Sequence, residues 1–128
     1  MDAAQALADL TEISSQIEAA VLFDESGTVQ AATLPDESAA AALAAAAGRL
    51  LADASAFRSD GAVTQLEASV QDGSVFVVRD GTRRIAAVTG PVPTVGLVFY
   101  DLKSALRGAA EEKPKRRRAA PKKADSAS

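Results

Sequence analysis

Apolar residues near the start of the chain recur at steps of three and four. In residues 3–18 these positions are Ala3, Leu7, Leu10, Ile13 and Ile17. A helix with 3.6 residues per turn would carry all of them on one face. The pattern therefore predicts a first helix over residues 3–18 with one buried stripe.

The next segment consists of two short apolar runs, residues 20–23 and 28–33, separated by Asp24-Glu25-Ser26-Gly27. Residues of this type favour a turn, and Gly27 can take the positive φ that a tight connection requires. The pattern predicts a β-hairpin with its tip at residues 24–27. Since no base or orienting group accompanies Ser26 in the sequence, we interpret the polar tip as turn chemistry and not as a catalytic site.

A long alanine-rich segment follows. Eleven of the 22 residues from Asp36 to Phe57 are Ala, the best helix former, and Asp36 is placed to cap the first free amides of a helix. The larger residues Leu43, Leu50 and Phe57 fall seven apart, with Ala47 and Ala54 between them, and form one stripe of this helix. A second stripe holds Ala42, Ala46, Arg49 and Asp53, small residues followed by a charge pair.

Strand patterns dominate the second half of the chain. Residues 65–71 alternate, with Gln65, Glu67 and Ser69 at the polar positions, which predicts a half-exposed strand. The apolar runs 75–78 and 85–88, joined by Asp80-Gly81, predict two more strands of a meander. After the Gly- and Pro-rich segment at 90–93, apolar residues recur at helical spacing and predict a last helix; they are Val95, Val98, Leu102 and Leu106.

Composition narrows the chemistry that the chain can perform. With no Cys and no His among 128 residues, most zinc sites, Cys nucleophiles, Ser-His triads and disulfides are excluded, and any metal site would have to consist of carboxylates alone. The segment GPVPTVG lacks the Lys and the Ser or Thr that a phosphate-binding loop needs. We therefore predict no catalytic residue, no metal site, no cofactor and no enzymatic activity.

Charge divides the chain into an acidic body and a basic tail. Residues 111–128 hold seven of the 14 Lys and Arg but three of the 17 acids, which leaves residues 1–110 with seven cations and 14 acids. With no large apolar residue, the tail cannot offset its ordering entropy. We predict one domain at residues 1–109 and a disordered tail at 110–128. The basic residues of the tail are Lys113, Lys115, Arg116, Arg117, Arg118, Lys122 and Lys123.

The basic tail has two interpretations, a solvated extension or a segment that binds nucleic acid or anionic membrane through its charge. Neither a secretory signal nor a membrane-spanning run is recognisable in the sequence, so we expect a cytoplasmic protein.

The order of predicted elements resembles the roadblock family of dynein-light-chain-like domains. The likeness runs through LTEISSQIEAAVLFDESGTVQAAT, DESAAAALAAAAGRLLADA, VFVVRDGTRRIAAVTG and VGLVFYDLKSAL, with the hairpin glycine at Gly27 and Gly96-Leu97 opening the last helix. It covers residues 7 to 107. The resemblance implies an α/β, profilin-like sandwich: a five-stranded antiparallel sheet with a long helix on one face and the two terminal helices on the other.

The resemblance also implies a function. Members form homo- or heterodimers through the long helix and the third strand, and regulate or scaffold small Ras-like GTPases. We therefore expect a non-enzymatic dimeric adaptor of a small Ras-like GTPase. From periodicity, the predicted dimer or partner surface comprises Ala42, Ala46, Arg49, Asp53, Gln65, Glu67 and Ser69. The alternatives are an Ala content that reflects genome composition alone, and a nucleic-acid- or anionic-membrane-associated protein that acts through its tail.

Overall fold

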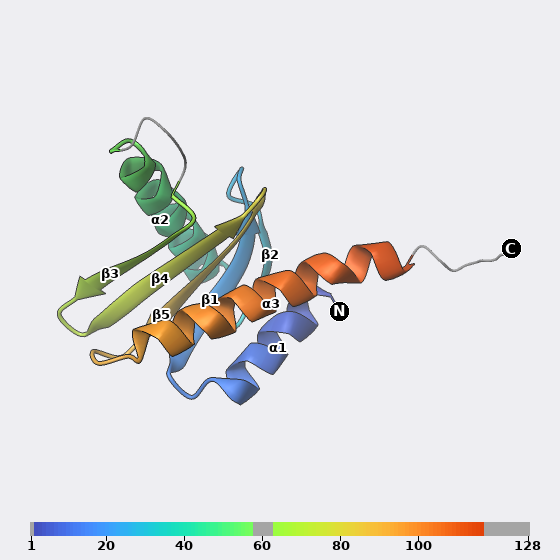
Figure 1. Cartoon of the computed structure of the whole chain (residues 1–128), viewed down its shortest axis with the longest axis horizontal. Helices are drawn as coiled ribbons and strands as arrows, with labels where there is room; N and C mark the ends of the chain where they lie inside the picture. Colours follow the sequence, from blue (N-terminus) through green and yellow to red (C-terminus); the bar gives the residue numbers. More distant parts are fainter. Residues whose placement is uncertain (1, 58–62, 117–128) are drawn as a thin grey trace, which may run out of the picture.

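Five antiparallel strands in one sheet and three helices make up the computed structural model, which describes residues 2–57 and 63–116 (Figure 1). The strands lie in the order β2-β1-β5-β4-β3, so β2 and β3 form the two edges. In chain order the elements are α1 (Ala3–Ile13), β1 (Ile17–Asp24), β2 (Val29–Ala32), α2 (Glu37–Ser55), β3 (Gln65–Val70), β4 (Gly73–Asp80), β5 (Arg83–Thr89) and α3 (Val95–Arg116).

Side chains on the two faces of the sheet pack into two separate cores. Along β1, Ala20 and Leu22 belong to the core under α1 and α3, whereas Val21 and Phe23 belong to the core under α2. The alternation arises because successive side chains of a strand point to opposite faces. Helix α2 thus covers one face of the sheet, and α1 and α3 lie side by side on the other (Figure 1). The predicted layer arrangement is confirmed.

The predicted β-hairpin is confirmed as β1 and β2. Leu22 pairs with Ala31, and the register shifts by a bulge before Phe23 pairs with Val29. Gly27 has φ of 89°, the left-handed region that favours glycine.

The first helix is shorter than predicted. It ends at Ile13, where the Ser14 amide donates to the Leu10 carbonyl as the C-cap, and Ile17 already lies in β1. Ile17 is buried as a strand residue, while Ile13 is 66% exposed. The helical spacing continued to Ile17 because a buried strand residue happened to fall four positions further on, so periodicity alone placed the helix end too late.

Helix α2 is confirmed over nearly its whole predicted length, but within its predicted stripe Ala47 is the fully buried member and the larger residues are not. The Asp36 side chain caps the helix by accepting from the Ser38 amide at 2.9 Å. Phe57 lies beyond the helix and is 89% exposed, and Leu43 and Leu50 are half-buried on one flank. Small side chains let the helix approach the sheet closely, so the buried positions are Ala40, Ala44, Ala47 and Leu51.

Helix α3 extends further than the predicted domain boundary at residue 109. It runs to Arg116, so residues 110–116, which we assigned to a disordered tail, are helical. Extending a helix that is already anchored by packing costs little per residue, and Glu, Lys and Arg are good helix formers. The remainder of the predicted tail, residues 117–128, lies outside the described residues. Within residues 2–57 and 63–116, no helix is long and apolar enough to cross a membrane.

Candidate functional site

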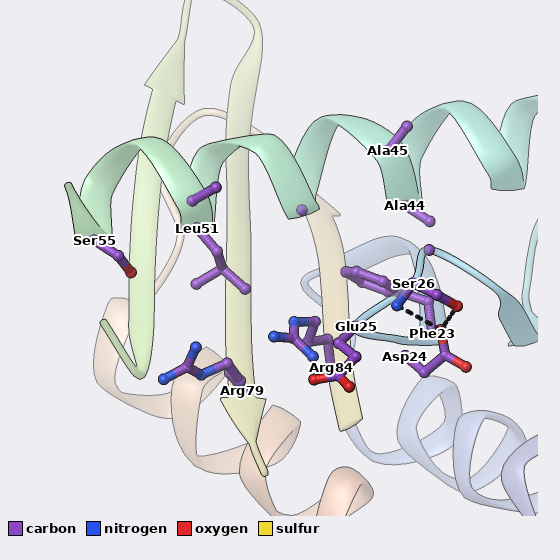
Figure 2. Close-up of a pocket in the computed structure, with 13 residues that line it drawn as sticks. Phe23, Asp24, Glu25, Ser26, Ala44, Ala45, Leu51, Ser55, Arg79 and Arg84 are labelled. Carbon is purple, nitrogen blue, oxygen red and sulfur yellow. Dashed lines mark hydrogen bonds between the residues drawn. The ribbon is translucent and has the colours of Figure 1, made fainter. Parts of the chain in front are cut away.

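The polar tip between β1 and β2 is organised around the carboxylate of Asp24 (Figure 2). Asp24 Oδ1 accepts from the Ser26 amide at 3.0 Å, from Ser26 Oγ at 2.6 Å and from the Thr28 amide at 3.0 Å. The Ser26 hydroxyl, followed by the Thr28 amide, is the main cause that lowers the pKa of Asp24 below its ordinary value of 3.8. These hydrogen bonds tie the Asp24 carboxylate to the residues of the turn. The interpretation of this segment as a turn is confirmed.

The predicted surface on α2 lies on the side of the helix that faces away from the sheet. Ala42, Ala46, Arg49 and Asp53 are all exposed, while Ala40, Ala44, Ala47 and Leu51 face the sheet. The outer face of α2, as we call these four exposed residues, combines two small side chains with one charge of each sign. A second helix could approach it closely.

Strand β3 leaves one row of backbone groups without a partner in the described residues. It pairs with β4 alone, and the Arg79 amide donates to the Thr64 carbonyl at 2.8 Å. In an antiparallel pair, hydrogen-bonded positions alternate with positions whose N–H and C=O point the other way. Counting from Thr64, the backbone groups of Gln65, Glu67 and Ser69 therefore point outward from the sheet edge.

The side chains of the predicted β3 positions do not lie on the same face as α2. The Glu67 carboxylate accepts from the hydroxyls of Ser69 and Ser74, each at 3.1 Å, and Ser74 is buried on the face covered by α1 and α3. The structure thus separates these side chains from the outer face of α2. A partner packed against the outer face of α2 could therefore reach the backbone edge of these residues but not their side chains.

The apolar residues of β3 form a candidate surface that the sequence analysis did not propose. Leu66 packs in the core under α2, so Ala68 and Val70, two and four residues further on, share that face. Val70 is 61% exposed. The alternation of residues 65–71 indicates this apolar face of the strand, but it does not indicate that Val70 at its end is exposed.

The remaining predicted site residues belong to the basic tail. Lys113, Lys115 and Arg116 lie in the last turns of α3, and the other four basic residues lie outside the described residues. Among residues 2–57 and 63–116, no group of three or more acidic, His or Cys side chains is arranged to hold a metal ion.

The sequence matches no protein-family model and no curated protein. The fold, in contrast, matches solved structures. The Roadblock/LC7 domain from Streptomyces avermitilis superimposes with a TM-score of 0.79 and 19% identity, over 88% of this chain and 98% of that one. An MglB structure with a tetrameric arrangement gives a TM-score of 0.68 and 19% identity, over 84% of this chain and 86% of that one.

Profilin II of Acanthamoeba castellanii matches as well, with a TM-score of 0.54 and 14% identity over 77% of this chain and 89% of that one. Likeness at these identities establishes the fold. The chain has the profilin-like fold of Roadblock/LC7 domains, as the resemblance in the sequence implied.

Proposed function

We propose that this chain is a non-enzymatic, dimeric adaptor that acts in the cytoplasm as a regulator of a small Ras-like GTPase. The observation that carries the proposal is the fold, shared along nearly the whole chain with a Roadblock/LC7 domain and with MglB. The family resemblance in the sequence adds the GTPase as the expected class of partner.

Self-association is supported by the open edge at β3. Gln65, Glu67 and Ser69 of this strand present outward N–H and C=O groups, and pairing with the β3 strand of a second copy would satisfy them. The outer face of α2 lies on the same side of the sheet as Ala68 and the exposed Val70. The related MglB structure has a tetrameric arrangement, which supports assembly as a property of this fold.

A role without catalysis fits the side chains that are present. The polar cluster at Asp24 serves the turn, since all the hydrogen bonds described for its carboxylate are to residues of the hairpin tip. A chain that offers surfaces instead of reacting groups acts by binding.

The proposal is tested with purified full-length protein and with Ras-like GTPases from the same genome, each loaded with GDP or with a non-hydrolysable GTP analogue. We expect a dimeric mass in solution, capture that depends on the loaded nucleotide, and a changed rate of GTP hydrolysis or nucleotide exchange. A monomer at micromolar concentration that captures no GTPase in either state would contradict the proposal.

A substitution in the outer face of α2 tests whether this surface is the dimer contact. Ala46→Arg places a large charged side chain on an exposed helix position, so we expect weaker dimerisation with an unchanged melting temperature of the monomer. The matched control is Ala8→Arg, at another exposed alanine, on α1 at the opposite face of the sheet. Equal loss of dimer in both variants would point to a general charge effect and not to this surface.

The tail is tested separately, because it is the basis of the alternative function. Removing residues 117–128 should leave GTPase capture intact if the folded domain carries the function. If instead the full chain binds duplex DNA or anionic vesicles, the truncated chain does not, and neither captures a GTPase, the alternative function replaces the adaptor.

A further inference from the structure

A groove of about 580 Å³ runs between the second half of α2 and the end of the sheet beneath it (Figure 2). Its floor is formed by Phe23 of β1, Arg84 of β5 and Arg79 of β4, which stand next to one another across the three strands. Its roof is α2. None of the four residues of the outer face of α2 lines this groove, so it is a different surface from the proposed dimer contact.

Two arginine residues with the same charge line the groove floor. Arg79 and Arg84 are direct cross-strand partners, and both side chains lie on the α2 face of the sheet (Figure 2). Like charges placed directly opposite in a sheet repel each other. The hydrogen bond described for the Arg84 guanidinium goes to the Thr82 carbonyl at 2.9 Å, outside the groove lining. Donors of both arginines therefore remain available to an anion on the groove side.

The roof leaves room above the arginines. Ala45, Gly48 and Ala52 line it, and a Cβ built at Gly48 would meet no atom within 4 Å. Small side chains on this flank of α2 keep the groove open along the helix, as a backbone lying in it would require. The groove therefore has small apolar side chains on its roof and charged side chains on its floor.

The charge along the groove selects the kind of anion. Glu25 of the hairpin tip lines the end next to Arg84, so a highly charged phosphate group would face a carboxylate as well as two guanidinium groups (Figure 2). A single carboxylate meets the planar donor forks of arginine in bidentate geometry. A peptide also carries backbone N–H groups, or a basic side chain, that suit the acidic end.

We propose that this groove binds an extended segment of a partner protein, with an Asp or Glu side chain of that segment held between Arg79 and Arg84. The small residues of α2 contact the flanking part of the segment. The inference rests on the register of β4 and β5 and on the open flank of α2, and it does not depend on the identity of a GTPase partner.

The experiment selects binders to the full-length chain from a displayed library of random 12-residue peptides. We expect enriched peptides to carry an acidic residue at a fixed position beside small apolar residues, and to bind more weakly as the salt concentration rises. In ¹⁵N–¹H NMR spectra, such a peptide should shift the amide signals of Gly48, Ala52 and Arg84. No enrichment of acidic peptides would overturn the proposal.

Substitutions assign the binding to the two arginines. The double variant Arg79→Gln/Arg84→Gln should weaken binding of a selected peptide at least tenfold. Arg83→Gln is the matched control, because Arg83 is the next residue along β5 and its side chain falls on the opposite face of the sheet. It should change affinity less than twofold. Replacing the acidic residue of the peptide by its amide should reproduce the loss seen in the double variant.

Other outcomes identify a different occupant and would overturn the proposal. If the peptides bind the double variant as tightly as the original chain, the groove is not their site. If inorganic phosphate at millimolar concentration produces the same NMR shifts and no acidic peptide is enriched, the arginines form a small-anion site. If the double variant abolishes self-association, a second copy of this chain occupies the groove.

Discussion

Three arginine side chains set the charge at the end of the sheet near the hairpin tip. Arg79 and Arg84 bring two positive charges together across β4 and β5, while the neighbouring Arg83 pairs in register with Asp24 on one side and Asp80 on the other. One arginine of this strand is thus flanked by opposite charge and the next by like charge. The unfavourable pair is the one that faces the groove, where a binding partner would supply the missing negative charge.

Reversing one charge of this pair should stabilise the free protein. Arg79→Glu replaces a repulsive cross-strand pair by an attractive one, so we expect the free energy of unfolding to rise by about 0.2–1 kcal/mol. Urea unfolding followed by circular dichroism measures it. Arg79→Gln is the control that removes the repulsion without adding attraction, and should give a smaller rise. A lower stability of Arg79→Glu would show that the two side chains do not repel each other in the folded state.

Asp24 makes the stability of the hairpin depend on pH. Hydrogen bonds from Ser26 and Thr28 lower its pKa in the folded state below the ordinary value of 3.8, so the folded state favours the ionised form. The resulting stabilisation is fully present above that value and is lost as the pH falls through the lowered pKa. Asp24→Asn should remove this dependence.

The measurement for Asp24 is the melting temperature of the original chain and of Asp24→Asn between pH 2 and pH 7. The difference between the two should be largest above about pH 4 and should shrink at lower pH. Glu25→Gln, at the same exposed tip, is the control, because it measures how the loss of one negative charge from this turn changes the melting temperature. A difference that stays constant down to pH 2 would mean that the turn stabilises no charged form of Asp24.

At the scale of elements, strands were more predictable than the faces of helices. Period-two alternation and the Asp-Gly turns fix where a strand runs and which side chains share a face. A helix gives a weaker signal when most of its residues are alanine. The large residues Leu43, Leu50 and Phe57 defined the predicted stripe of α2, whereas close packing on the sheet selected small residues, Ala47 of that same stripe and Ala44 beside it.

The sequence indicates the strands and the helix that form the groove, but it does not indicate how the helix lies over the strands. Asp80-Gly81 predicts a tight turn, and a two-residue connection pairs Asp80 with Arg83 and hence Arg79 with Arg84. That register could have been counted from the sequence. The position of α2 above the pair could not, because it depends on the packing of Ala40, Ala44 and Leu51 against the sheet.

Gly48 links the stability of α2 to the opening of the groove. Glycine inside a helix is less favourable than alanine by about 0.5–1 kcal/mol, and a Cβ at this position meets no atom within 4 Å. Gly48→Ala should therefore raise the free energy of unfolding by about that amount. The added methyl group would narrow the groove, so a peptide selected on the original chain should bind the variant more weakly.

Two measurements on Gly48→Ala separate these effects. Thermal unfolding reports the helix, and peptide titration reports the groove. Ala42→Gly, on the outer face of the same helix, is the matched control, since it should lower stability by a similar amount without changing peptide affinity. Unchanged affinity in Gly48→Ala would place the peptide away from this flank of α2.

At the scale of the whole molecule, one sheet separates two cores and leaves three distinct surfaces. The edge of β3, the outer face of α2 and the arginine groove are formed by different residues and offer different chemistry: backbone pairing, close helix packing and recognition of a carboxylate. The short β2 strand at the other edge has four residues, against six in β3. If a second copy adds to the sheet, β3 therefore offers the longer row of backbone hydrogen bonds.

Proline at position 69 tests whether β3 is the contact between copies. The amide of Ser69 points outward from the sheet, so Ser69→Pro removes a donor that the ladder with β4 does not use. Ala68, which would precede the proline, is already extended, the conformation that proline imposes on its neighbour. The monomer should therefore keep its fold, while the paired edge of a dimer would lose hydrogen bonds and meet the proline ring.

We expect Ser69→Pro to shift the mass measured by light scattering from dimer to monomer, with an unchanged circular dichroism spectrum. Ser69→Ala is the matched control, because it loses the hydroxyl that donates to Glu67 but keeps the backbone N–H. It should remain dimeric. Because a dimer is stabilised by mass action, the melting temperature of the original chain should rise with protein concentration, and that of Ser69→Pro should not. A dimer that withstands the proline would not depend on the β3 edge, and loss of that dimer in Ala46→Arg would assign the contact to the outer face of α2.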